Sequence, residues 1–279
     1  MAEIDTLIFD VDDTLYPVSC GFSEHRNSDV ICGFMLAKLG FEDRDAAMTL
    51  RNEYFRRYHS SMKGLLVAGQ EGKLPKPFKE EELADWFAGE CDFAGHLAPN
   101  PELREALLSL RDEAKLNLVV FSNAPRRYCM NCLKALGVED LFEERRIFGV
   151  DDVLPACKPE PAAFEKILAA VGSAPSRAVM FEDSMKNIRA ASALGLHTVL
   201  VDEAGGEARA AGGEAGLLAD APCAEDPAVG ATLRHIGELR ARLPELWQRR
   251  FARRRPAEEE APAPTGGESP LQVVPPAAA

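Results

Sequence analysis

The chain has 279 residues, of which 46% are hydrophobic and 28% charged, and its formal net charge at pH 7 is −13. This composition is typical of a soluble globular protein, and the length suffices for one large domain with an inserted subdomain. An acidic surface repels the phosphates of a nucleic-acid polymer, so we expect a small-molecule partner. The sequence has neither an apolar run of about 18 residues nor an N-terminal signal pattern, which predicts no membrane partner and a cytoplasmic location.

Short apolar runs of strand length recur along the chain and alternate with helical stretches. They lie at residues 6–9, 118–121, 178–181 and 198–201, with a weaker candidate at 146–150. Apolar runs without polar alternation are typical of parallel strands that are covered by helices on both faces. The sequence therefore predicts an α/β fold with a doubly wound, Rossmann-like parallel sheet.

The region between the first two runs has helical periodicity without convincing strands. It predicts an all-helical insert over 17–98 after the first strand, so that 1–16 and 99–251 form a discontinuous core. Within the core, an apolar stripe predicts a helix over 226–251 that Pro244 kinks or breaks. Pro, Ala, Glu and Gly dominate afterwards, and we expect 252–279 to be a disordered tail.

The seven cysteines are scattered, and their odd number favours reduced thiols over a disulfide framework. Cys129 and Cys132 have the spacing of a metal or redox pair, but no second pair or histidine follows at zinc spacing. We therefore expect both thiols in the core or on a helix surface. A basic cluster is either a solvated helix end or a nuclear-import signal, which leaves a nuclear location open; it contains Arg249, Arg250, Arg253, Arg254 and Arg255.

Polar residues follow several predicted strands at the point where each strand ends. They are Asp10, Asp12 and Thr14 after the first strand, Ser122 and Asn123 after the second, Lys158 before a helix, and Glu182 and Asp183 after a later strand. Singly, each has an ordinary interpretation as a solvated turn, a surface lysine or a helix cap. Because the carboxyl ends of parallel strands meet at one edge of a sheet, the whole set predicts a catalytic site there.

In this order, the motifs D-x-D-x-T, Ser, Lys and an acidic pair resemble those of the haloacid dehalogenase superfamily. The segments 12–17, 61–65 and 243–247 further resemble the pyrimidine 5′-nucleotidase-like branch of plants and fungi. The resemblance covers about 4–250 and implies a Mg²⁺-dependent phosphatase with an aspartyl-phosphate intermediate. Asp12 favours phosphoryl chemistry, because enzymes of the dehalogenase type do not need an acid two residues after the nucleophile.

The resemblance also implies a role for each matched residue. Asp10 is expected to be the nucleophile, and Asp12 the general acid and later the general base. Phosphoryl oxygens are expected to be bound by Ser122, Asn123 and Lys158. Mg²⁺ is expected on Asp10, the backbone carbonyl of Asp12 and Asp183, with Glu182 acting through water or as an orienting group, although the order of this pair could be reversed. Thr14 is expected to support the loop.

The resemblance implies that the insert over 17–98 is a helical cap on a catalytic core formed by 1–16 and 99–251. Substrate choice is expected to lie in this cap, where candidate contacts are Phe22, His25, Arg26, Arg57, His59 and Lys63. The leading substrate is a pyrimidine nucleoside 5′-monophosphate. Phosphoglycolate or a sugar phosphate is the first alternative, and phosphomutase activity is another. A catalytically weak regulatory or binding protein is the alternative outside the enzymes. The sequence does not indicate whether the protein is a monomer or an oligomer.

Overall fold

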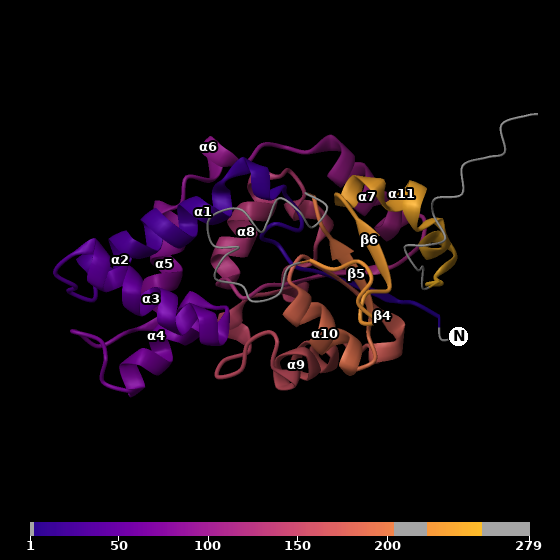
Figure 1. Ribbon diagram of the computed structural model, residues 1–279. Coiled ribbons are helices and arrows are strands. Elements are labelled where there is room, and N and C mark those ends of the chain that lie inside the picture. The colour runs from indigo at the N-terminus through magenta and orange to yellow at the C-terminus, as the bar shows by residue number, and fades with distance from the viewer. Residues whose placement is uncertain (1–2, 204–221, 253–279) are drawn as a thin grey trace, which may run out of the picture.

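A parallel sheet forms the centre of the protein (Figure 1). The computed structural model describes residues 3–203 and 222–252. The strands are β1 (Thr6–Phe9), β2 (Asn117–Phe121), β3 (Ile147–Phe148), β4 (Ala178–Glu182), β5 (His197–Val201) and β6 (Ala231–Leu233). They lie in the order β3-β2-β1-β4-β5-β6, and all neighbouring pairs are parallel. Each of the five runs predicted from the sequence contains a strand.

Helices cover both faces of this sheet (Figure 1). The core helices are α7 (Pro101–Asp112), α8 (Arg126–Ala135), α9 (Pro161–Val171), α10 (Met185–Ala193) and the short α11 (Leu239–Arg242). Ile8 of β1 clusters with residues of α9 and α10, whereas the adjacent Leu7 clusters with residues of α7 and α8. Successive residues of one strand therefore enter two separate cores, which explains why the strands are apolar on both sides.

A group of helices follows β1 and lies to one side of the sheet, in indigo and purple in Figure 1. These helices are α1 (Phe22–His25), α2 (Ile31–Ala37), α3 (Arg44–Tyr58), α4 (Ser61–Gln70), α5 (Glu80–Glu90) and α6 (Phe93–His96), with a turn of π-helix at Arg26–Val30. No strand occurs between β1 and β2, a stretch that the structure describes completely, so the expected all-helical cap is confirmed. The chain returns to the core at α7, which Asn100 caps just before Pro101.

The turn between α3 and α4 connects the cap to the core. The chain reverses at His59, whose φ of 49° lies in the left-handed region. Ser60 then caps α4 by accepting a hydrogen bond from the Lys63 amide, and its hydroxyl donates to the Asn123 carbonyl over 3.1 Å. His59 Nε2 also lies 2.6 Å from Lys186 Nζ of α10. The first turn of α4 is thus attached to the loop that follows β2.

The segment after residue 226 differs from the prediction of one helix over 226–251, which is wrong. The structure instead has β6, α11 and a 3-10 turn at Pro244–Gln248. The apolar stripe is buried as expected, for example at Leu233 and Leu246. However, pairing with β5 makes the backbone extended at β6, and a proline ring cannot continue the helix that precedes it.

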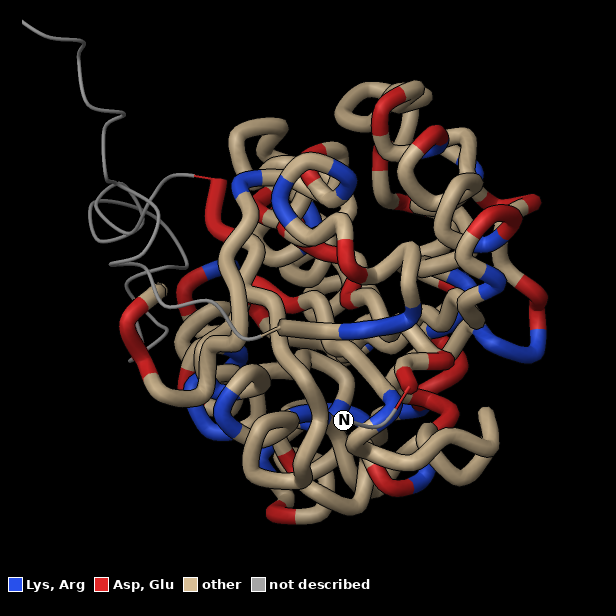
Figure 2. The backbone as a smooth tube through the Cα atoms, turned by 90° about the vertical axis from the view of Figure 1, so that its right-hand side faces the viewer, with Lys and Arg blue, Asp and Glu red and all other residues tan. Residues whose placement is uncertain are grey.

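Charged residues of both signs are intermingled along the described chain (Figure 2). Within the basic cluster, Arg249 donates to the carbonyl of Ile4 over 3.1 Å and pairs with Glu3. Arg250 of the same cluster donates to the Gln248 side chain. The other three arginines, at 253–255, lie outside the described residues, as does the predicted tail from 253 onward. Among the described residues, every helix is too short or too polar to span a membrane.

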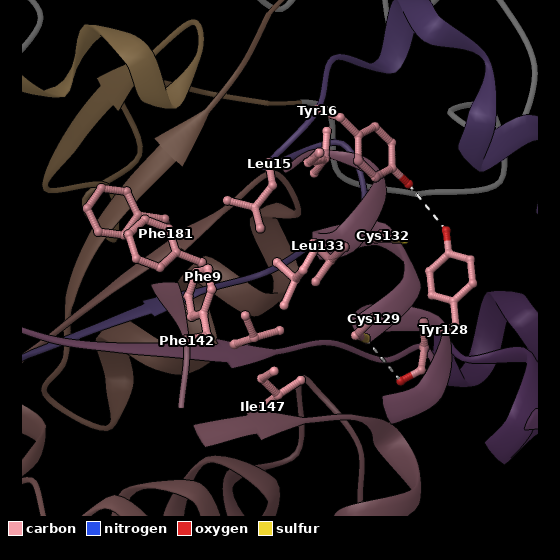
Figure 3. Packing of buried hydrophobic residues seen from close by; sticks show 14 of the residues in the cluster. Phe9, Leu15, Tyr16, Tyr128, Cys129, Cys132, Leu133, Phe142, Ile147 and Phe181 are labelled. Atoms are coloured by element: carbon pink, nitrogen blue, oxygen red, sulfur yellow. Dashed lines mark hydrogen bonds between the residues drawn. The ribbon is translucent and has the colours of Figure 1, made fainter. Parts of the chain in front are cut away.

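Cys129 and Cys132 lie on the core side of α8, inside the hydrophobic cluster of Figure 3. Both are fully buried, and burial raises the pKa of each thiol well above its usual value. The Cys129 thiol donates to the carbonyl of Ala124 over 3.9 Å. The interpretation of these two residues as core cysteines is confirmed.

Candidate active site

The register of the three central strands gathers the predicted site residues at one edge of the sheet. Phe9 at the end of β1 pairs with Val120 of β2 and Phe181 of β4. The residues that follow these positions therefore leave the sheet side by side. The amide of Asp10 still donates to the Phe181 carbonyl over 3.0 Å. This bond holds the start of the loop after β1, which carries Asp10, Asp12 and Tyr16 and is called the catalytic loop, against β4.

Lys158 connects the loops at this edge. Its side chain is 1% exposed, and Nζ donates to Asp10 Oδ1 at 2.8 Å, to Glu182 Oε2 at 2.7 Å and to the Phe121 carbonyl at 2.9 Å. Burial alone lowers the pKa of an ammonium group, but the carboxylates of Asp10 and Glu182 outweigh it and raise the pKa of Lys158. The site therefore has a permanent buried cation among its acidic groups.

The carboxylates of Asp10, Glu182 and Asp183 form a compact acidic cluster. One oxygen of each lies within 4.8 Å of the others. Burial, with the nearby charges of Asp183 and Asp12, raises the pKa of Asp10 to about 6 although Lys158 opposes this. Burial and the charge of Asp10 likewise raise the pKa of Glu182 well above its usual value. Such repulsion between hard oxygen donors is relieved by a divalent cation, so the residues fit Mg²⁺.

Glu182 is also bound to protein groups through both carboxylate oxygens. Oε2 accepts from Lys158, and Oε1 accepts from the Ser184 amide over 3.2 Å. These bonds favour the orienting role that was expected for Glu182 over a primary role as a metal ligand.

Asp12 is held by three side chains. Tyr128 Oη donates to Asp12 Oδ1 over 2.7 Å, and Tyr16 Oη donates to the same oxygen. The other oxygen, Oδ2, forms an ion pair with Arg26 of the cap. Burial and then the charge of Asp12 raise the pKa of Tyr16, and burial also raises that of Tyr128 although the Arg26 cation opposes it. Both phenols therefore remain donors at neutral pH.

Asn123 organises the loop that carries Lys158. Its side-chain amide donates to the Lys158 carbonyl over 2.8 Å, and its Oδ1 accepts from the Lys158 amide over 2.9 Å. The same side chain donates to the His59 carbonyl of the cap over 3.2 Å. The Asn123 side chain is thus bonded to the backbone of both the Lys158 loop and the cap.

Ser122 and Thr14 are both buried beside the catalytic loop. Ser122 Oγ accepts from the Ala124 amide over 3.0 Å and also forms a side-chain hydrogen bond with the Cys129 thiol. Thr14 Oγ1 is buried without a hydrogen-bond partner. The support of the loop by Thr14 stays a prediction.

The matched motifs correspond to a known family. The family model of haloacid dehalogenase-like hydrolases matches residues 4–195, which include every residue of the site and more than half of the chain. The chain belongs to this family. The four motifs from Asp10 to Asp183 lie inside the matched region, whereas the segment 243–247 lies beyond it, and the predicted membership of the haloacid dehalogenase superfamily is confirmed.

Several curated proteins are similar to this haloacid dehalogenase-like hydrolase. Phosphate metabolism protein 8 of Saccharomyces cerevisiae is 29% identical over 202 residues, which are 69% of this chain and 60% of that protein. A phosphoglycolate phosphatase of Pseudomonas putida is 30% identical over 139 residues, or 48% of this chain and 50% of that protein. A phosphorylated carbohydrates phosphatase of Thermotoga maritima is 29% identical over 107 residues, or 38% and 48%. The chain thus spans between about half and 60% of the length of these relatives.

Solved structures share the fold of this hydrolase. CbbY from Rhodobacter sphaeroides, in complex with phosphate, superimposes with a TM-score of 0.59 at 20% identity, over 85% of this chain and 96% of that one. A haloacid dehalogenase-type phosphatase from Thermococcus onnurineus gives a TM-score of 0.54 at 22% identity, over 85% and 97%. These similarities confirm the predicted α/β fold with its inserted cap.

A pocket of about 110 Å³ lies between the core edge and the cap of this hydrolase. Of the six predicted cap contacts, Arg26 and His59 line it. The sequence analysis missed other lining residues, namely Ser23, Asn27, Phe55, Ser60, Ser61, Met62 and Phe87 of the cap and Asn187 of the core. Ser61 and Met62 belong to the segment 61–65 that carried part of the resemblance. The only signal of the others in the sequence is their place in the inserted segment or just after the last motif.

The other four cap candidates lie elsewhere. Phe22 is buried and stacks on Tyr128 with ring centroids 5.8 Å apart. His25 stacks on His96, and Arg57 pairs with Glu71 on the outside of the cap. Lys63 is buried and forms an ion pair with Glu160, a core residue. Phe22 and His25 are thus engaged in packing, Arg57 in an ion pair within the cap, and Lys63 in an ion pair between cap and core.

Proposed function

We propose that this hydrolase is a Mg²⁺-dependent phosphatase that acts on a small phosphate monoester through an aspartyl-phosphate on Asp10. The observation that carries the proposal is the contact of Lys158 Nζ with both Asp10 and Glu182 beside Asp183. A carboxylate that attacks a phosphate dianion meets a repulsion of roughly 8 kcal/mol, from about 4 for each pair of charges at 4 Å. A buried ammonium group and a divalent cation together offset this repulsion.

The reaction proceeds in two steps. Asp10 attacks phosphorus, the bond to the leaving oxygen breaks, and Asp12 gives that oxygen a proton. Water then attacks phosphorus, Asp12 accepts a proton, and Asp10 is regenerated with release of inorganic phosphate. Ser122, Lys158 and the Asn123 amide bind the phosphoryl oxygens during both steps.

Asp10, Asp183 and the backbone carbonyl of Asp12 are the residues that would hold Mg²⁺, with Glu182 as the orienting neighbour. When bound, the ion neutralises charge on the phosphoryl oxygens. The residues of the chain bring the ester to Asp10, transfer a proton through Asp12 and exclude bulk water under the cap.

The preferred substrate is a pyrimidine nucleoside 5′-monophosphate, as the motifs resembling the nucleotidase branch imply. Phe55 and Phe87 of the cap line the pocket and offer apolar surface to a base. The second candidate is phosphoglycolate or a sugar phosphate. It is favoured by the names of the bacterial relatives, a phosphoglycolate phosphatase and a phosphorylated carbohydrates phosphatase.

The test is phosphate release from UMP, CMP, AMP, phosphoglycolate and sugar phosphates, with Mg²⁺ or EDTA. We expect release that requires Mg²⁺ and is lost in Asp10→Asn, while Asp45→Asn, which changes an exposed cap carboxylate, stays active. Preference for UMP and CMP supports the nucleotidase. An active Asp10→Asn enzyme contradicts the mechanism, isomerised ester without free phosphate indicates a mutase, and no turnover of any ester indicates a binding protein.

A further inference from the structure

Two buried tyrosines meet at one oxygen of Asp12. The hydroxyls of Tyr16 and Tyr128 both donate to Asp12 Oδ1 and lie 3.4 Å from each other. Figure 3 shows them pointing toward one another from the catalytic loop and from α8. They are separated by 112 positions in the chain, so only the fold brings them together.

The surrounding residues fix both phenol rings. Tyr128 is fully buried and stacks on Phe22 with an interplanar angle of 6°. The Arg26 guanidinium lies 4.9 Å from the centre of the Tyr128 ring. Tyr16 is 3% exposed, and its hydroxyl also lies 3.1 Å from Ser23 Oγ. Rings packed in this way cannot turn away, so their hydroxyls determine the orientation of the carboxylate they hold.

The two oxygens of Asp12 therefore have different surroundings. Oδ1 contacts phenols that belong to the loop and to the core helix α8, whereas Oδ2 pairs with Arg26 of the cap. The pocket lies between core and cap and is lined by both Asp12 and Arg26. A leaving group that extends toward the cap approaches Asp12 on the side of Oδ2.

We propose that Tyr16 and Tyr128 are positioning residues that fix Asp12 so that Oδ2 exchanges the proton with the leaving group. This inference rests on the proposed function, because it assumes that Asp12 is the general acid. The leaving oxygen takes the place of the Arg26 guanidinium at Oδ2, while Oδ1 stays bonded to both phenols. Proton transfer from a fixed carboxyl group is efficient only when its geometry is maintained.

The role can be tested because only some esters need a proton. An alkoxide leaving group must be protonated as it departs, whereas p-nitrophenolate leaves without one. The experiment compares kcat/KM, which reports formation of the phospho-enzyme, for the best alkyl ester of the substrate panel and for p-nitrophenyl phosphate. For Tyr128→Phe and Tyr16→Phe we expect a loss of about tenfold with the alkyl ester, and about 100-fold in the double variant. With p-nitrophenyl phosphate, kcat/KM stays within about twofold of wild type.

Asp12→Asn is the reference and should show the same selective loss, only larger. Tyr54→Phe is the matched control, because Tyr54 is also buried but bonds Glu71 in the cap; we expect it to retain both activities. Equal losses with both esters, or no loss with either, overturn the proposal. If the double variant does not fold in thermal unfolding, the single variants decide. A wild-type enzyme inactive on every ester refutes the proposed function instead, so the two failures are distinguishable.

Discussion

The ammonium group of Lys158 is buried between two carboxylates of the site. Lys158 is a fully buried lysine, and it remains charged because two carboxylates accept from its Nζ. Groups of this kind are expensive to remove one at a time, since the partner charges stay buried. Lys158 therefore contributes to the stability of this edge of the sheet.

Replacing Lys158 by Met should both destabilise the protein and abolish turnover. The change leaves Asp10 and Glu182 buried without their cation, and the free energy of unfolding should fall by about 3–5 kcal/mol. Urea denaturation in EDTA measures the stability, and phosphate release measures the activity. Lys166→Met, which changes an exposed lysine of α9, is the control and should alter neither. A Lys158→Met protein as stable as wild type would show that the charges are not coupled.

Residue identity was the most predictable part of the site. Asp10, Ser122 and Glu182 follow apolar runs directly, so their place at the strand ends could be deduced from the order of the sequence. Tyr16 and Tyr128 could not be identified in this way. Their contact with Asp12 depends on how α8 packs against the catalytic loop, and an aromatic residue on a core-facing helix normally indicates packing alone.

At the scale of elements, the first turn of α4 links the cap to the catalytic loop. Ser60 caps this helix and also binds the Asn123 carbonyl, while Asn123 in turn holds the backbone of Lys158. A change at the N-terminus of this helix can therefore reach Asn123 and Lys158.

Ser60→Ala should lower the free energy of unfolding by about 1–2 kcal/mol and also raise KM, because one cap bond and one bond to the Asn123 loop are lost. Asp43→Ala is the matched control, since Asp43 caps α3 in the same manner, accepting from the Ala46 amide over 2.8 Å. It should lose about 1 kcal/mol without a change in KM. Urea denaturation and steady-state kinetics measure both quantities. An unchanged KM in Ser60→Ala would show that the contact of Ser60 with the Asn123 loop does not influence the site.

His197 at the start of β5 should make stability depend on pH. Burial lowers the pKa of His197 below its usual value of 6.5, and its ring lies 4.9 Å from that of Phe251. As pH falls below about 6.5 the unfolded chain binds a proton more readily than the folded one, so the free energy of unfolding decreases. Denaturation between pH 7 and 5 should show a shallower decrease in His197→Gln than in wild type. The exposed His235→Gln should keep the wild-type slope.

Secondary structure was predictable where local pattern and tertiary environment agree. The central strands are apolar on both sides, so their runs were evident. The strand β6 is short, and its extended backbone comes from pairing with β5. Its one leucine, Leu233, fits a helical stripe with the apolar residues that follow it equally well, and this explains why the helix predicted over 226–251 is wrong.

At the scale of the whole molecule, the cap and the core bury nearly all of the cysteines. Cys223 is exposed and Cys20 is intermediate, whereas Cys32, Cys91, Cys129, Cys132 and Cys157 are buried. Burial raises the pKa of Cys91 and Cys157 to about 12, so these thiols are poor nucleophiles as well as inaccessible.

The number of cysteines that react with a thiol reagent should therefore differ between the folded and the unfolded protein. We expect Cys223 to react fast in the native protein, Cys20 more slowly, and all seven cysteines after denaturation in guanidinium. A chromogenic disulfide reagent gives the numbers, and Cys223→Ser should remove the fast phase. Fast reaction of a third thiol in the native state would indicate that the cap opens away from the core.

The sequence by itself determined the family, the central strands of the sheet and the residues at the strand ends, because strand polarity forces those residues to one edge. Only the tertiary structure decided which cap residues reach the pocket: Arg26 and His59 line it, whereas Arg57 and Lys63 have other partners. The physical reason is that a helical side chain is placed by how its helix packs, and two helices with similar sequences can present different faces. Packing likewise set the two tyrosines against Asp12.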